Sequence, residues 1–186
     1  ARAVQMTLTP VVVTAEAQPD GSFSRPIAPL RSRVTGEGFP NLVLASDGVA
    51  RTIRLTRGEF PSFALAVAQL YTHALNQPLT LPPTEITRIH FSGPNRTFSH
   101  LSAIDVLGGK IPEQFIRGKV VLVGATALDL QDYHITPFGK TSGVEIQANI
   151  ISTVLKGNYY THASGWSYLA LIVLGIVAIV ITVRIE

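Results

Sequence analysis

An uncharged apolar run near the end of the chain constrains the fold more than any other feature of the sequence. Residues 166–183 read WSYLALIVLGIVAIVITV and carry no charged side chain. Wound into an α-helix at about 1.5 Å per residue, this run spans roughly 27 Å, which is close to the hydrocarbon thickness of a bilayer. The run is also too long for an ordinary β-strand. The sequence therefore predicts one transmembrane helix over residues 166–184.

The residues on either side of this run indicate its orientation. Aromatic side chains gather at its N-terminal end, as in the interfacial belts of membrane helices: Tyr159, Tyr160, Trp166 and Tyr168. Arg184 follows the run, and positive charge favours the cytoplasmic side. We therefore expect a cell-membrane protein that contacts the lipid bilayer, with the residues before about 166 extracytoplasmic, either periplasmic or outside the cell. The chain begins at Ala1 without an initiator methionine, so we expect it to belong to a longer polypeptide.

Composition and charge exclude several classes of protein. Charged residues make up 15% of the chain, against roughly 25% in soluble domains. The net charge is +3, but the basic residues are scattered and form no long run, so no nucleic-acid partner is expected. The chain has no cysteine, which excludes disulfides and thiolate metal ligands.

The spacing of apolar residues predicts an α/β domain before the terminal run. Apolar positions at helical spacing predict helices over residues 60–75 and 144–155, and a shorter one over residues 102–107. Extended segments are predicted at residues 11–13, 39–45, 48–55 and 88–92. Residues 120–124, VVLVG, are wholly apolar, which is typical of a central strand buried on both faces of a parallel sheet. The alternation of strands and helices predicts a mixed, mostly parallel sheet with flanking helices, followed by the transmembrane helix.

The stretch of residues 115–157 resembles the type-two CHASE domains. Its matches to that family's motif are Phe115, Gly118, Lys119, Gly124, Thr126, Ala127, Asp132, Thr136, Pro137, Gly143, Val144, Glu145 and Ala148. Upstream matches are Asp47-Gly48-Val49 with Arg51, and Ser62-Phe63-Ala64. The resemblance covers residues 11–159, and it departs from the family at Gln147, where many relatives have histidine.

The resemblance implies an extracytoplasmic signal-sensing domain of a transmembrane receptor. Such a receptor regulates a cytoplasmic output domain, commonly an adenylate or guanylate cyclase or a protein kinase. We expect residues 1–158 to be the C-terminal part of the sensor domain, residues 159–165 a linker and residues 166–184 the membrane helix. The signal is a small molecule or a stress, a homodimer is expected by analogy with such receptors, and no cofactor and no enzymatic activity are expected in this segment.

The candidate ligand-binding residues are Gly124, Thr126, Asp129, Asp132, Thr136, Asp47 and Arg51. The backbone amides after residue 123 can hold an anion, or Gly124 is needed for a tight turn. Asp129, Asp132 and His134 form a D-x-x-D-x-H pattern that either contacts a ligand or metal or caps loop amides. Arg51 has three candidate ion-pair partners, Asp47, Glu59 and Asp132, and Glu145 suits the first turn of a helix.

Two other functions are compatible with the same residues. One is a membrane-anchored binding or assembly module without a signalling role. The other is an extracytoplasmic hydrolase that uses the loop of Asp129 and Asp132. No G-x-S-x-G motif surrounds any serine, and no nucleophile and base can be placed from the spacing, so no catalytic residue is assigned.

Overall fold

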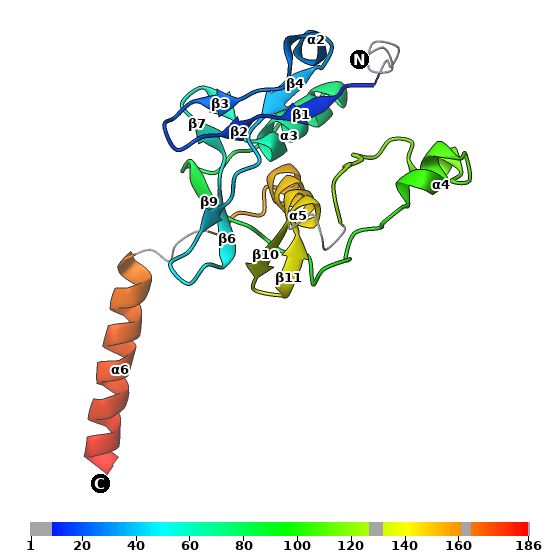
Figure 1. The fold of residues 1–186 in the computed structure, drawn as a ribbon. Coiled ribbons are helices and arrows are strands. Elements are labelled where there is room, and N and C mark those ends of the chain that lie inside the picture. The colour runs from blue at the N-terminus through cyan, green and yellow to red at the C-terminus, as the bar shows by residue number, and fades with distance from the viewer. Residues whose placement is uncertain (1–8, 127–131, 161–164, 186) are drawn as a thin grey trace.

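Two packed helices, α3 (Phe63–Ala74) and α5 (Gly143–Lys156), form the centre of the fold. The computed structural model in Figure 1 describes residues 9–126, 132–160 and 165–185. Both helices present apolar side chains to the core at helical spacing, where they meet residues of strand β6 (Ala50–Arg54). The largest apolar side chains that are almost fully buried are Ile53, Leu65, Ile146, Ile150 and Val154.

The helices predicted over residues 60–75 and 144–155 are confirmed, and local capping fixes their ends. Ser62 precedes α3, and its hydroxyl accepts a hydrogen bond from the Leu65 amide at 3.2 Å. The helix begins later than predicted because β8 (Phe60–Pro61) pairs with β7 (Thr56–Arg57). Helix α5 ends at Gly157, whose φ of 63° lies in the left-handed region that favours glycine.

The other elements are short. The remaining strands are β1 (Val12–Thr14), β2 (Glu16–Ala17), β3 (Phe23–Ser24), β4 (Gly36–Gly38), β5 (Val43–Leu44), β9 (Ile86–Arg88), β10 (Tyr133–Thr136) and β11 (Gly139–Ser142). The remaining helices are α2 (Ala28–Arg31), α4 (Ala103–Leu107), the 3₁₀ turn η1 (Glu113–Phe115) and α6 (Gly165–Ile185). The predictions of a short helix near residues 102–107 and of two extended segments around the turn at Asp47 are confirmed.

The sheets are mostly antiparallel, so the prediction of a mostly parallel sheet is wrong. The largest sheet has the strand order β5-β6-β9 and is antiparallel throughout. Among the described strands, β1 and β4 form the one parallel pair. The connections from β5 to β6 and from β10 to β11 are only a few residues long. Such connections form hairpins, whereas a parallel pair needs a crossover of a dozen or more residues.

The predicted central strand at residues 120–124 does not form. These residues make no backbone hydrogen bond to another described residue. They nevertheless keep the alternation of a strand, because Val120 and Leu122 pack against the core while Val121 and Val123 are 55% and 93% exposed. No described strand pairs with the run. The prediction of a central strand buried on both faces is therefore wrong, because one face of the run packs against the core while the other is exposed.

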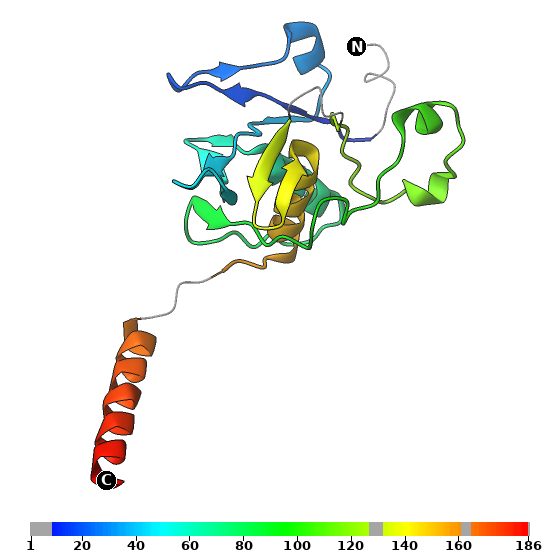
Figure 2. The ribbon, with the colours of Figure 1, turned by 60° about the horizontal axis from the view of Figure 1, so that its bottom comes forward.

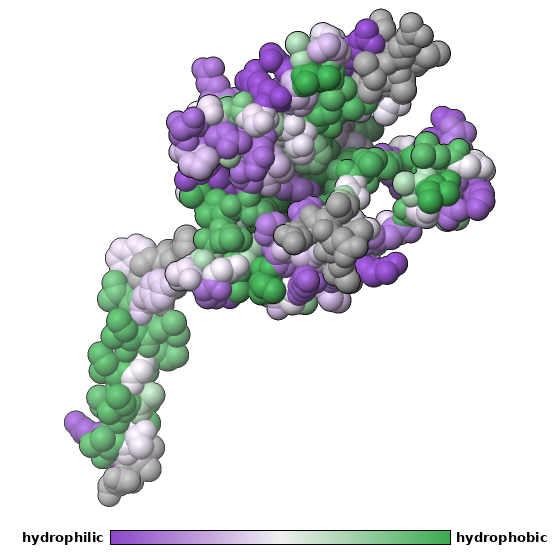
Figure 3. Space-filling view, in the orientation of Figure 1, coloured by the Kyte–Doolittle hydropathy of each residue, from purple (hydrophilic) through white to green (hydrophobic). Residues whose placement is uncertain are grey.

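The helix predicted at residues 166–184 is present as α6, but its assignment as a transmembrane helix is not supported. No helix in the described part of the chain is long and apolar enough to cross a membrane. The side chains of residues 169–183 are exposed and give α6 the apolar surface seen in Figure 3, and α6 extends away from the α3–α5 body in Figure 1.

Truncating Ile146 to alanine tests the core that α5 supplies. This side chain is fully buried, so Ile146→Ala is expected to lower the free energy of unfolding by about 2–5 kcal/mol. Urea unfolding followed by circular dichroism measures the loss. The matched control is Ile104→Ala, since Ile104 is 77% exposed and its loss is expected to cost less than about 0.5 kcal/mol. Equal losses in the two variants would contradict this core.

Candidate functional site

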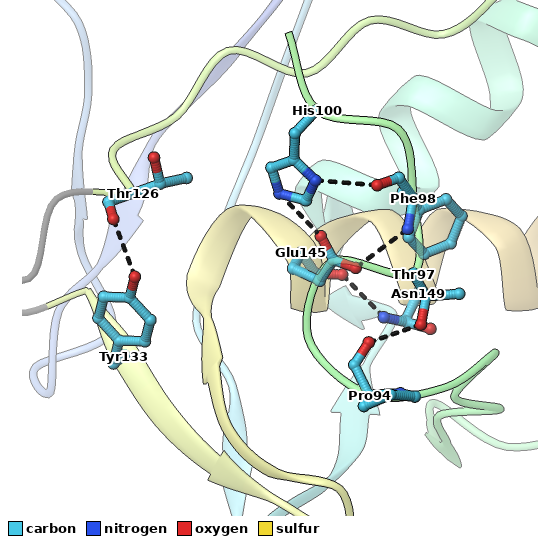
Figure 4. Close-up of polar contacts among 8 residues, drawn as sticks. All are labelled: Pro94, Thr97, Phe98, His100, Thr126, Tyr133, Glu145 and Asn149. Carbon is cyan, nitrogen blue, oxygen red and sulfur yellow. Dashed lines mark hydrogen bonds and ion pairs between the residues drawn. The ribbon is translucent and has the colours of Figure 1, made fainter. Parts of the chain in front are cut away.

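A buried carboxylate lies at the start of α5. Glu145 is in the first turn of the helix, where the helix dipole favours negative charge, and the residue is only 3% exposed. Its Oε1 accepts a hydrogen bond from the Phe98 amide at 3.2 Å, and its Oε2 lies 3.2 Å from His100 Nε2 (Figure 4). His100 Nδ1 lies 2.8 Å from the Phe98 carbonyl oxygen. The carboxylate thus holds two points of the segment that precedes α4.

Two further polar side chains continue this contact along α5. The side-chain oxygen Oδ1 of Asn149 accepts a hydrogen bond from the Ser92 amide at 2.8 Å, and the Thr153 hydroxyl accepts one from the His90 amide at 3.0 Å. Asn149 and Thr153 are 1% and 2% exposed. The three residues stand at positions i, i+4 and i+8, so they share one face of the helix. We call Glu145, Asn149 and Thr153 the polar stripe, and it fastens residues 90–98 to α5.

The polar stripe was not predicted as a unit. From the sequence, Glu145 was expected only to interact with the helix dipole, and the helix was predicted from its apolar residues. Asn149 and Thr153 were given no role. The signal that would have found them is the spacing itself, because three polar residues at four-residue intervals lie on one face of a helix. Their partners are 47 to 63 residues away, so no local pattern names them.

The structure pairs Arg51 with Asp47, the first of its three candidate partners. Arg51 Nη1 lies 2.8 Å from Asp47 Oδ1, and the Val49 amide donates to the same oxygen at 3.1 Å. The hydrogen bond from Arg51, followed by that from Val49, lowers the pKa of the Asp47 carboxyl below its ordinary value. Asp47 in turn raises the pKa of Arg51. The two residues therefore hold the turn between β5 and β6.

Three of the predicted residues lie around the start of α5. A Cβ at Gly124 would stand 2.6 Å from Val144 Cβ, so glycine there allows the chain to approach the helix closely. A Cβ at Gly143 would likewise collide with the Asp132 carboxylate. The Thr126 carbonyl accepts a hydrogen bond from the Tyr133 hydroxyl at 2.8 Å (Figure 4). These contacts are structural, and ligand binding at Gly124, Thr126 and Asp132 stays a prediction.

Thr136 serves the hairpin of β10 and β11, which lies against α5 in Figure 2. The residue is 3% exposed, and its hydroxyl lies 2.9 Å from the Gly139 carbonyl and 3.0 Å from the Thr141 hydroxyl. The Phe138 amide donates to the same oxygen at 3.2 Å. A hydroxyl with these partners is occupied within its own turn, and no described hydrogen bond or ion pair joins it to Asp47 or Arg51.

The possible metal site of the D-x-x-D-x-H pattern is only partly in view. Asp129 lies outside the described residues. Asp132 Oδ1 and His134 Nε2 are 3.7 Å apart, and both side chains are partly exposed. In the described part of the chain, no group of three or more histidine, cysteine or acidic residues is placed to hold a metal ion. Gln147, at the position where many relatives have histidine, donates a hydrogen bond to the Pro40 carbonyl at 2.8 Å.

Removing the Glu145 carboxylate tests the polar stripe. Glu145→Ala leaves the Phe98 amide without its acceptor and the His100 ring without its carboxylate partner, so the free energy of unfolding is expected to fall by about 1–3 kcal/mol. Urea unfolding measures this change. Glu59→Ala removes an exposed carboxylate of the same size and is expected to change it by less than about 0.5 kcal/mol. A neutral effect at Glu145 would show that the buried contact carries no net stability.

Comparison with known proteins supports the resemblance seen in the sequence. The family model of the CHASE2 domain matches residues 1–182, which is more than the span over which the motifs alone indicated a resemblance. No curated protein and no solved structure gives a significant match to the chain. CHASE2 domains are extracytoplasmic sensory modules that are not themselves catalytic. The chain belongs to the CHASE2 domain family.

Proposed function

We propose that this domain senses a signal outside the cytoplasm and controls a cytoplasmic output domain, either an adenylate or guanylate cyclase or a protein kinase. The observation that carries the proposal is the match of the CHASE2 family model over residues 1–182. The residues before about 166 then lie on the extracytoplasmic side of the cell membrane. The signal is a small molecule or a stress, and the working unit is a homodimer. The segment itself has no catalytic role.

The connection between the polar stripe and the end of α5 supports a signalling role. One face of α5 holds residues 90–98, and the C-terminal end of the same helix leads through Gly157 toward α6. Just after the helix, the Tyr159 hydroxyl donates a hydrogen bond to the Thr80 carbonyl at 3.0 Å, and burial raises the pKa of Tyr159. A change in how residues 90–98 sit on α5 therefore has a direct covalent path to the chain that precedes α6.

Changing the polar stripe in the intact receptor tests the sensor proposal without knowledge of the signal. Glu145→Gln keeps an oxygen that accepts from the Phe98 amide but removes the charge that faces His100. We expect it to change the basal cyclase or kinase activity of the receptor at least about twofold, since shifting a two-state balance by a few tenths of a kcal/mol has that effect. Enzyme assay of membranes that carry equal amounts of receptor measures the activity.

The matched control is Glu59→Gln, which removes an exposed charge away from the polar stripe. It is expected to leave basal activity unchanged. If Glu145→Gln also leaves the output unchanged while the domain stays folded, the sensor proposal fails. A binding or assembly module without a signalling role then accounts better for the fold.

Lengthening the connection after α5 tests the path itself. Four Gly and Ser residues inserted after Asn158 are expected to abolish the effect of Glu145→Gln on output, because a flexible chain does not transmit a shift of α5. The same four residues inserted after Gly21, in the exposed turn between β2 and β3, are expected to leave that effect intact. The double variants are compared in the same membrane assay. Persistence of the effect across the Asn158 insertion would rule out this path.

A further inference from the structure

A pocket of about 240 Å³ opens where the chain leaves β9 and passes the start of β6. The turn between β10 and β11 contributes to its lining, as does the chain just after α5. The lining residues that matter for the argument are Arg51, Arg88, His90, Phe91, Phe138 and Tyr160. These residues come from four separate segments of the chain, so the fold alone brings the segments together. Arg51 belonged to the predicted ligand-binding set, whereas the others did not.

The charge of the pocket is positive. Arg88 is exposed and has no ion-pair or hydrogen-bond partner for its guanidinium among the described residues. Arg51 is already paired with Asp47, and because Arg88 stands opposite Thr52 in the sheet, the Arg51 side chain leaves the other face. No described carboxylate lines the pocket. A guanidinium group presents a planar fork of N–H donors that matches a carboxylate or a phosphate. The unused donors of Arg88 therefore point to an anionic ligand.

The rest of the lining is aromatic. The His90 and Tyr160 rings stack with centroids 5.6 Å apart and an interplanar angle of 18°. The Phe91 and Phe138 rings are 6.2 Å apart and tilted by 55°. Phe138 and Tyr160 are 50% and 56% exposed, so part of each ring is open to a ligand. Exposed aromatic faces of this kind favour contact with a flat apolar group.

We propose that this pocket binds a small organic anion that carries a carboxylate or phosphate on one flat ring. The anionic group contacts Arg88, and the ring lies against Tyr160, which stacks on His90. Arg88 and His90 are two residues apart in extended chain, so their side chains lie on the same face. A cavity of about 150 Å³ holds benzene, so a pocket of about 240 Å³ has room for one ring and its anionic group.

The pocket is joined to the polar stripe by the chain that lines it. His90 offers its ring to the pocket, while its backbone amide donates to Thr153 of α5. Tyr160, whose ring stacks on that of His90, follows the end of α5 in the chain. A ligand here contacts both ends of the path described above. That the bound anion acts as the signal rests on the proposed sensor function, whereas binding itself does not.

Titration of the full chain with phenyl phosphate tests the proposal. Isothermal calorimetry and the change in tyrosine fluorescence are expected to show saturable binding of one molecule per chain. Inorganic phosphate, which lacks the ring, and benzyl alcohol, which lacks the charge, are each expected to bind at least about tenfold more weakly. Phosphate that binds as tightly as phenyl phosphate would overturn the aromatic contact. Equal binding of benzyl alcohol would overturn the anionic contact, and a lack of saturable binding by phenyl phosphate would overturn the pocket.

Two variants locate the binding. Arg88→Gln is expected to weaken phenyl phosphate binding at least about tenfold with the fold intact, since the Arg88 guanidinium holds no other described group. Tyr160→Ala is expected to weaken phenyl phosphate but not inorganic phosphate. The control is Arg33→Gln, which removes the same charge from a residue outside the pocket and is expected to leave both affinities unchanged. Equal weakening by Arg33→Gln and Arg88→Gln would show that only net charge matters, and would overturn the site.

The intact receptor separates failure of the site from failure of the sensor function. If phenyl phosphate binds and changes the output, and Arg88→Gln removes both effects, the site and its role in sensing are supported together. If the ligand binds through Arg88 but Glu145→Gln and the ligand both leave the output unchanged, the binding site stands and the sensor function fails. If Glu145→Gln changes the output but phenyl phosphate does not bind, the sensor function stands and the site is wrong.

Discussion

The polar stripe on α5 is the contact on which the arrangement of the other parts depends. Residues 90–98 follow β9, and no described strand pairs with them. A buried amide without an acceptor costs about 1–3 kcal/mol. Glu145, Asn149 and Thr153 supply the missing acceptors from a helix. The adjacent face of the same helix, one residue further on at each turn, supplies Ile146, Ile150 and Val154 to the core. One helix therefore fixes both the apolar centre and the path of an irregular segment, and the pocket is built on that segment.

The parts of the fold that depend on local sequence were predictable. Helices α3 and α5 follow from apolar residues at helical spacing, and their ends follow from Ser62 and Gly157. The hairpin around Asp47 follows from a turn sequence, and the ion pair with Arg51 joins residues only four positions apart. The run at residues 120–124 shows where this reasoning stops. Its composition indicates an extended segment, but pairing depends on which other strands are present, and that information is not local.

The candidate site was harder to predict for the same reason. The motif residues Gly124, Asp132 and Thr136 do have particular roles, but these are close packing against Val144, contact with Gly143 and closure of a hairpin turn. A motif marks residues that a family needs, and the need is often structural. The pocket shared by Arg51, Arg88, His90 and Tyr160 has no motif, because its members come from three separate segments. Only the fold places the Arg88 guanidinium and the stacked rings of His90 and Tyr160 in one pocket.

The way residues 90–98 are held decides what kind of motion a ligand could produce. A ligand shifts a conformational balance only by binding one arrangement more tightly than another. Here the segment is joined to α5 at three points along two turns of helix, so moving one point strains the other two. Because every broken contact leaves a buried polar group unpaired, partial release is costly, and the segment and the helix are expected to move together. A rigid unit of this kind carries a small displacement at His90 to Tyr160 without loss, since the ring stack ties the start of the segment to the chain that follows the helix.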